Sequence, residues 1–153
     1  MKKHLFSSPL IFLLLSIFTI SCGKEEPLDL PAPEFTKARA LDMPAYFEFN
    51  HNYTIEVVYM LPSSCYRPIG LGIERKGNTA EGLRNVFVTG IARKNSEATC
   101  SENGKVASEI TESFYMRIDQ AQPYMFYFYN GLNAEGKYHF TEVEIPVKIL
   151  EEK

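Results

Sequence analysis

The sequence predicts an all-β fold, an antiparallel β-sandwich of about seven or eight strands, with a small β-barrel as the alternative. Most segments after residue 34 alternate apolar and polar side chains, the two-residue period of a half-buried strand. No stretch of eleven residues places its apolar side chains on one helical stripe. Turn-forming residues separate the alternating segments at short intervals. The 132 residues after residue 21 are enough for one domain with a packed core.

The first half of the predicted domain contains five alternating segments: 35–40, 46–49, 53–61, 66–76 and 83–94. Segment 53–61 alternates most clearly, with these side chains on one face: Ile55, Val57, Tyr59 and Leu61. In segment 66–76 we expect Ile69, Leu71 and Ile73 to point inward, and Gly70, Gly72 and Glu74 outward. Segment 83–94 has apolar residues on both faces, as expected for a central strand. Residues 76–82 and 95–105 read as loops.

The second half contains three further segments, 111–119, 124–129 and 138–150. Phe114, Met116 and Ile118 share one face of the first. The last segment changes phase between Phe140 and Val143, which predicts a β-bulge at that point. Pro146 has no N–H to donate to a neighbouring strand, so this end of the segment should lie at a sheet edge.

The N-terminal residues have the features of an export signal. Lys2 and Lys3 precede an apolar run over residues 5–20, which is too short to span a bilayer comfortably. The run ends in Thr19-Ile20-Ser21-Cys22, which resembles the bacterial lipobox. The resemblance implies that residues 1–21 are a signal peptide and that Cys22 carries lipid. Ordinary secretion with a chance cysteine and an uncleaved anchor helix are the alternatives.

Residues 22–34 read as a tether because prolines alternate there with charged residues. Within it, Lys24-Glu25-Glu26 resembles the signal that sends Bacteroidota lipoproteins to the outer face of the outer membrane. The alternative is that these charges only keep the tether in solvent. We therefore expect one domain over residues 35–153, held by lipid on the outer membrane. Its location would be the cell surface or, alternatively, the periplasmic face.

The cysteines predict one disulfide. Lipidation of Cys22 would leave Cys65 and Cys100, an even pair in an oxidising compartment. A bond between them would close a loop of about 36 residues and contribute about 4 kcal/mol on the chain-entropy model. The sequence has no C-x-x-C spacing, so neither a redox motif nor a thiolate zinc site is indicated.

The sequence contains no recognisable catalytic, metal or cofactor motif. After residue 21 the histidines are His51 and His139, and no serine lies in a G-x-S-x-G motif. Glu142 and Glu144 alternate with apolar residues, as on the solvent face of a strand. Without the two lysines of residues 1–21 the formal charge becomes about −5, which argues against nucleic acid as a partner. We expect no enzyme activity, no metal and no cofactor.

One strand is aromatic on both faces. Tyr124, Phe126 and Phe128 share one face, which we expect to be the core face. The other face would carry Met125, Tyr127 and Tyr129, with Tyr115 joining them across the sheet. Tyrosine rings are flat, apolar and polar at one edge, so an exposed set could bind a glycan or a protein. The alternative is that a loop covers them or that they pack closely near the tether.

Gly136-Lys137-Tyr138, followed by alternating residues, resembles the last strand of bacterial immunoglobulin-like domains. The sequence has no tryptophan and no recognisable tyrosine corner, so the comparison concerns architecture only. Together these features predict a lipid-anchored envelope protein that serves as a binding or adhesion module. A structural or accessory subunit of an envelope complex is the alternative, and a small hydrolase is a more distant one.

Overall fold

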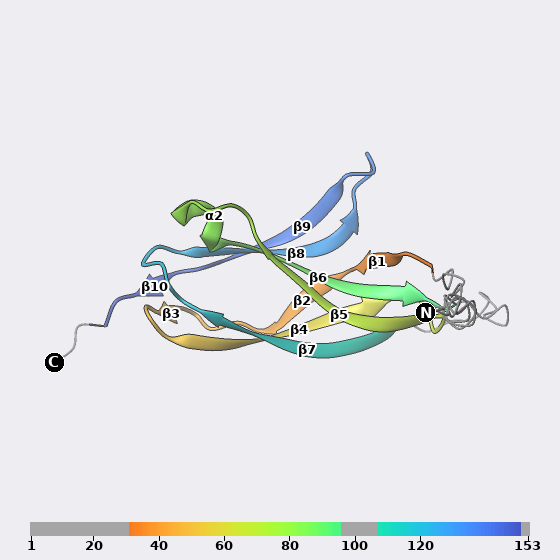
Figure 1. The fold of residues 1–153 in the computed structure, drawn as a ribbon, viewed down its shortest axis with the longest axis horizontal. Coiled ribbons are helices and arrows are strands. Elements are labelled where there is room, and N and C mark those ends of the chain that lie inside the picture. The colour runs from red at the N-terminus through yellow and green to blue at the C-terminus, as the bar shows by residue number, and fades with distance from the viewer. Residues whose placement is uncertain (1–30, 96–106, 151–153) are drawn as a thin grey trace, which may run out of the picture.

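The computed structural model describes residues 31–95 and 107–150. The described residues form ten strands and one short helix, arranged as layered sheets (Figure 1). The elements in chain order are β1 (Pro33–Thr36), β2 (Ala38–Asp42), β3 (Phe47–Glu48), β4 (Asn52–Leu61), β5 (Tyr66–Arg75), α2 (Ala80–Arg84), β6 (Asn85–Lys94), β7 (Ser108–Arg117), β8 (Tyr124–Leu132), β9 (Tyr138–Ile145) and β10 (Val147–Lys148). The predicted all-β class is confirmed.

Two main sheets share one core. The larger contains β1, β5, β6, β8 and β9, and the smaller has the order β2-β4-β7. Buried side chains from both sheets form a single cluster, which includes Val57, Val88 and Phe126. Figure 1 shows β8 and β9 above β4 and β7, and the loop between β8 and β9 projects away from the sheets. The described strands close no barrel, and the arrangement agrees with a sandwich.

The larger sheet forks at β6. One edge of β6 pairs with β5 along nearly its whole length. The other edge pairs with β8 over Asn85–Val88, in parallel, and then with β1 over Gly90–Arg93, antiparallel. The strands β8 and β1 therefore diverge around Thr89. A second parallel pair joins β3 to β10. The prediction of a wholly antiparallel sandwich is wrong for these two pairs, and they do not establish immunoglobulin-like topology.

The chain crosses between the two sheets at Lys37. The sequence predicted one strand over residues 35–40, but β1 pairs with β6 while β2 pairs with β4 in the other sheet. Strand β1 already begins at Pro33, which lies opposite Arg93. The predicted tether over residues 22–34 is therefore too long by two residues, because Pro33 and Glu34 belong to the sheet.

The inward side chains follow the predicted alternation in the central strands. All four expected residues of β4 are buried, as are Tyr124, Phe126 and Phe128 of β8. Met116 and Ile118 are also buried, with Phe114 packed against the core. At Gly90 the two sheets lie close together, since a Cβ atom there would lie 2.6 Å from Tyr59 Cβ of β4 and 2.3 Å from Thr36 Oγ1 of the neighbouring strand β1. Only glycine fits at this position of β6.

Strand β5 departs from its predicted pattern. Leu71 packs against the core, but Ile69 and Ile73 are 48% and 39% exposed. The register with β6 shifts between Pro68 and Gly70, so Ile69 falls within a bulge. One edge of β5 has no strand partner among the described residues, which leaves Ile73 at the margin of the sheet.

The predicted bulge between Phe140 and Val143 is also wrong. Strand β9 pairs with β8 without a shift over these residues. The shift lies instead in β8, between Tyr129 and Leu132, where Gly131 has a φ of +98°. Pro146 ends β9, as expected for a residue without an N–H, and the chain then pairs with β3.

The predicted loop over residues 76–82 contains the start of α2. This helix has only five residues, too few to produce an apolar stripe that periodicity could reveal. The Thr79 side chain accepts a hydrogen bond from the Gly82 backbone N–H at 3.1 Å, which is a typical N-cap.

A tyrosine corner is present, although the sequence did not reveal one. Tyr124, at the start of β8, is fully buried, and its hydroxyl accepts hydrogen bonds from the backbone N–H groups of Asp119 and Gln120, both at 3.1 Å. The same hydroxyl donates to Asp119 Oδ1 at 2.7 Å. A tyrosine that bonds back to the chain a few residues upstream fixes the corner between strands of different sheets. Here it fixes the turn from β7 to β8.

Several predicted features lie outside the described residues. These are residues 1–21 as a signal peptide, Cys22 as the lipid carrier, Lys24, Glu25 and Glu26 as an export signal, and Cys100 as the partner of Cys65. Cys65 itself is fully buried at the end of the turn after β4. No helix in residues 31–95 or 107–150 is long and apolar enough to cross a membrane.

Candidate binding groove

The outward face of the larger sheet carries a second group of aromatic side chains. Alternation along β6, β8 and β9 sends one set of residues to the core and the next set to this face. We define the outer aromatic cluster as six residues from four strands: Phe35, Phe87, Tyr127, Tyr129, Tyr138 and Phe140.

The rings of the outer aromatic cluster form a continuous series of contacts. At the β1 end, Phe35, Tyr129 and Tyr138 meet edge to face, with centroids 5.7 to 6.1 Å apart. At the other end, Phe87 and Tyr127 stack at 4.5 Å with an angle of 9° between their planes. Phe140 joins the two ends, 5.9 Å from Tyr129 and 5.4 Å from Phe87. These are the separations and orientations that aromatic pairs favour.

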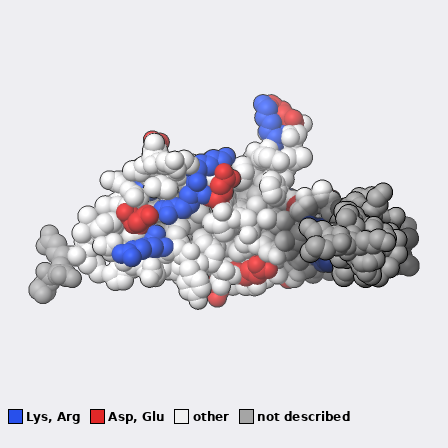
Figure 2. Space-filling view, in the orientation of Figure 1, with Lys and Arg blue, Asp and Glu red and all other residues white. Residues whose placement is uncertain are grey.

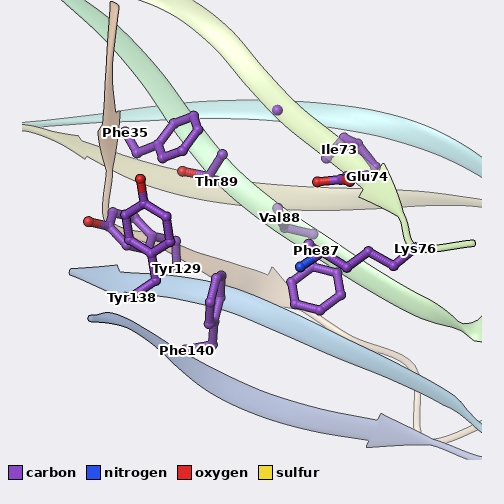
Figure 3. A pocket seen from close by; sticks show the side chains of 11 residues that line it. Phe35, Ile73, Glu74, Lys76, Phe87, Val88, Thr89, Tyr129, Tyr138 and Phe140 are labelled. Atoms are coloured by element: carbon purple, nitrogen blue, oxygen red, sulfur yellow. The ribbon is translucent and has the colours of Figure 1, made fainter. Parts of the chain in front are cut away.

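A hollow of about 260 Å³ opens beside these rings, where β8 and β1 diverge from each other along β6. We call it the aromatic groove. Figure 3 shows Phe35 at one end and Phe87 at the other, with Tyr129, Tyr138 and Phe140 along one side. The remaining lining residues are Gly72, Ile73, Glu74, Lys76, Val88 and Thr89. Aromatic rings therefore form both ends and one side of the groove, while aliphatic, polar and charged residues form the rest.

Gly72 leaves this face of β5 without a side chain next to the groove. Gly72 lies opposite Thr89, two residues before Glu74, and offers no side chain there. Gly70 differs from the prediction, because a Cβ atom on it would lie 3.6 Å from Glu112 Oε2 of β7 in the smaller sheet. A Cβ atom on Gly72 would lie 2.8 Å from Thr89 Cγ2 and 3.2 Å from Ile91 Cδ1. The Thr89 and Ile91 side chains of β6 thus occupy the space where a Gly72 side chain would lie, and the Gly72 backbone borders the hollow.

Charged groups of both signs border the groove on the β5 side. Lys76 Nζ lies 4.1 Å from the centroid of the Phe87 ring, a cation–π contact. Glu74 lines the same side (Figure 3). On the face drawn in Figure 2, positive and negative side chains are likewise interspersed. Because neither sign dominates the rim, the groove does not select for a strongly charged ligand.

Burial of the Tyr129 ring raises the pKa of its hydroxyl above the usual value, and interaction with Tyr138 raises it further. The hydroxyl therefore stays protonated at neutral pH and can both donate and accept hydrogen bonds. The described residues place no group of three His, Cys, Asp or Glu side chains where they could hold a metal ion. The groove is suited to noncovalent binding by ring stacking and hydrogen bonds.

The predicted tyrosine surface is only partly correct. Tyr127 lies on the outward face but is half-buried in its stack with Phe87. Tyr129 is only 7% exposed, because Phe35, Tyr138 and Phe140 surround its ring. The predicted exposure of Tyr129 is therefore wrong.

The other two predicted residues do not line the aromatic groove. Met125 is half-buried and borders a separate shallow hollow together with Arg84 and Glu144. Tyr115 is 82% exposed, but it lies on β7 of the smaller sheet, opposite Thr54. It cannot join the tyrosines of β8 across one sheet, so this part of the prediction is wrong.

The most exposed rings of the groove were missed by the sequence prediction. Phe35 and Tyr138 are 52% and 61% exposed, on β1 and β9. A two-residue spacing does link Tyr138 to Phe140, and it could have indicated an outward aromatic pair. Nothing in the local sequence reveals that Phe35 lies beside them, because that contact depends on how β1 pairs with β6.

Comparison of the chain with protein-family models, with curated proteins and with solved structures found no match.

Proposed function

We propose that this protein is a non-enzymatic, lipid-anchored binding protein of the bacterial envelope, and that the aromatic groove is its binding site. The lipobox-like Cys22 and the export-like Lys24-Glu25-Glu26 favour the outer membrane, at the cell surface, with the domain held by lipid. The proposed role is to hold a ligand outside the cytoplasm rather than to convert it.

The exposure of Phe35 and Tyr138 is the observation that carries this proposal. Both rings are more than half exposed and stand beside a hollow, although the domain already has a full core between its sheets. An apolar surface of this kind, bordered by polar groups, is typical of a binding site. Removal of either ring should therefore weaken binding more than it weakens the fold.

An immunoglobulin-like origin for the domain is a further part of the proposal. The tyrosine corner at Tyr124 supports it, since the corner joins strands of different sheets. The parallel pairing of β6 with β8 differs from the antiparallel sheets of that family. The comparison therefore concerns the sandwich architecture, and the function rests on the groove alone.

The proposal can be tested with full-length protein displayed on cells. Fluorescent glycan and peptide collections would be applied to wild type, to a Phe35→Ala/Tyr138→Ala double variant and to Tyr115→Ala. We expect wild type to retain at least one ligand, the double variant to lose it, and Tyr115→Ala to retain it. Tyr115 is the matched control because it is an exposed tyrosine on the other sheet.

Two results would contradict the proposal. One is that wild type retains no member of either collection. The other is that the double variant retains every ligand as well as wild type does, which would place binding elsewhere on the protein.

A further inference from the structure

We infer that the ligand of the aromatic groove is an uncharged glycan, of which one pyranose ring sits in the hollow between Phe35, Tyr138 and Glu74. This inference rests on the proposed function and assigns a ligand class to the same site. Four features of the groove support it: its rings, its polar groups, its charge and its size.

The rings provide the apolar part of the site. Aromatic faces carry partial negative charge and their edges partial positive charge, so the C–H bonds on one face of a sugar ring pack well on them. Tyr138 and Phe35 are the rings most open to such contact, and they meet edge to face at 6.0 Å. The cluster behind them holds both rings in place, which lowers the entropy cost of binding.

The polar groups suit a ligand rich in hydroxyl groups. The Tyr129 and Tyr138 side chains bring their hydroxyls to the Phe35 end of the hollow, while Glu74 and Lys76 lie on the β5 side (Figure 3). Tyrosine hydroxyls donate and accept, a carboxylate accepts, and an ammonium donates. A sugar ring has hydroxyl groups around its edge that can satisfy all of these. A hydrocarbon chain would instead leave Glu74 and Lys76 without partners as it displaced their water.

Charge argues for a neutral sugar. An acidic sugar would face Glu74, in a chain whose formal charge is −3, and an amino sugar would face Lys76. Because the two charges lie on the same rim, any charged ligand gains from one and is repelled by the other. An uncharged ring gains hydrogen bonds from both.

Size argues against a protein partner at this site. The hollow has a volume of about 260 Å³ and opens to solvent, so it admits a ring-sized group rather than an extended interface. A stable protein interface covers about 800 Å² on each partner. Neighbours of a bound sugar unit would leave through the open side, so the groove can accept an internal unit of a chain.

The test measures binding of full-length protein, purified in detergent, to four uncharged oligosaccharides: maltopentaose, xylopentaose, cellopentaose and mannopentaose. Tri-galacturonic acid and a tyrosine-rich neutral peptide serve as the acidic and peptide probes. The chain has no tryptophan, so its tyrosine emission reports on contact with the saccharide probes, and calorimetry gives the dissociation constant of every probe, including the peptide. We expect at least one neutral oligosaccharide to bind with a dissociation constant below 1 mM.

The variants link that binding to the groove. Tyr138→Ala should weaken it about tenfold, a change equivalent to about 1.4 kcal/mol. Glu74→Gln should weaken it about threefold, since the amide still accepts a hydrogen bond but loses the charge. Tyr115→Ala should bind as wild type does. Tyr138 is 61% exposed, so its truncation should leave the fold intact, which circular dichroism would verify.

The inference is overturned if none of the four neutral oligosaccharides binds at 10 mM, or if Tyr138→Ala binds them as well as wild type does. Preference for tri-galacturonic acid over every neutral probe would also overturn it. If the peptide binds wild type but not Tyr138→Ala, the glycan assignment fails while the proposed function stands. The glycan assignment and the proposed function both fail under two joint conditions. No probe distinguishes Tyr138→Ala from wild type, and the Phe35→Ala/Tyr138→Ala variant displayed on cells retains the same ligands as wild type.

Discussion

Two tyrosines only nine residues apart differ sharply in their surroundings. Tyr129 is 7% exposed and packed among three rings, whereas Tyr138 is 61% exposed. We predict that Tyr129→Ala lowers the free energy of unfolding by about 3 kcal/mol, as expected for a buried aromatic side chain. Tyr138→Ala should lower it by less than about 1 kcal/mol, as is usual at the surface. Urea unfolding measures both, and equal losses would show that Tyr138 belongs to the packed structure rather than to a binding surface.

The tyrosine corner links stability to pH through Asp119. Its carboxylate accepts a hydrogen bond from Arg75 Nη2 at 2.9 Å and another from Tyr124 at 2.7 Å. The Arg75 hydrogen bond, with a further contribution from Tyr124, holds the pKa of Asp119 below its usual value, while partial burial opposes them. A lowered folded-state pKa adds stability that is present above about pH 4, the unfolded value, and is lost as pH falls through the folded value.

We therefore predict that Asp119→Asn is less stable than wild type at pH 7, by about 0.5–1 kcal/mol, because solvent screens this partly exposed ion pair. The difference should shrink as the pH is lowered from 4 toward 2, where wild type loses the same charge. Urea midpoints of the two proteins across this range would measure it. A difference that stays constant from pH 7 to pH 2 would mean that the charge of Asp119 adds nothing to stability.

At the scale of the elements, β6 organises the larger sheet, and Gly90 sets how closely the smaller sheet approaches it. A methyl group there would overlap Thr36 and Tyr59 of neighbouring strands, both of which are buried. We predict that Gly90→Ala costs 3 kcal/mol or more, at the upper end of the cost of about 1–3 kcal/mol for overpacking, because backbone strands would have to move. The measurement is the thermal unfolding midpoint.

Gly136→Ala provides the matched control for Gly90→Ala. Nothing lies within 4 Å of a Cβ at Gly136, but its φ is +75°. Only backbone strain, about 1–2 kcal/mol, should result. If Gly136→Ala proved the more costly of the two, the close approach of the sheets at Gly90 would be wrong.

The sequence predicts burial well for strands in which the alternation of side chains alone determines which residues face the core. In β4 and β8 one face is continuously apolar, so burial follows from alternation alone. In β9, Phe140 faces outward and Val143 inward, and each is apolar because each face has its own cluster. The sequence pattern was interpreted as a bulge. A bulge and a regular strand that is apolar on both faces give the same shift in the positions of apolar residues.

The groove could not be predicted because it depends on pairing between distant strands. It opens where β8 and β1 share one edge of β6, and no local pattern in Pro33–Thr36 specifies that partner. The aromatic character of the face was partly predictable, since Tyr127 and Tyr129 were placed on it. Which of those rings would be exposed was not, because Phe35 and Tyr138 cover Tyr129 from other strands.

For the molecule as a whole, the proposed attachment to a membrane would decide where the groove can act. If Cys22 carries the lipid, Cys22→Ala should leave the protein in the soluble fraction or as an unprocessed precursor, because no anchoring acyl chains are added. Two or three chains give stable attachment, at about 0.8 kcal/mol for each buried CH₂ group. Membrane fractionation and the electrophoretic mobility of the protein measure this directly. A variant that fractionates and migrates like wild type would mean that Cys22 does not carry the anchor.

Replacing Lys24, Glu25 and Glu26 together by alanine separates attachment from orientation, and it serves as the control for Cys22→Ala because the cysteine is kept. We predict that this triple variant remains in the membrane fraction but resists protease added to intact cells, whereas wild type is cut. If the charges act in export and not in holding the lipid, the two properties should change independently. The readout is the amount of intact protein after protease treatment, with lysed cells to confirm that the variant can be cleaved. Equal cleavage of both proteins on intact cells would show that these three residues serve only as part of the tether, and that another feature of the chain determines the side of the membrane on which the groove is exposed.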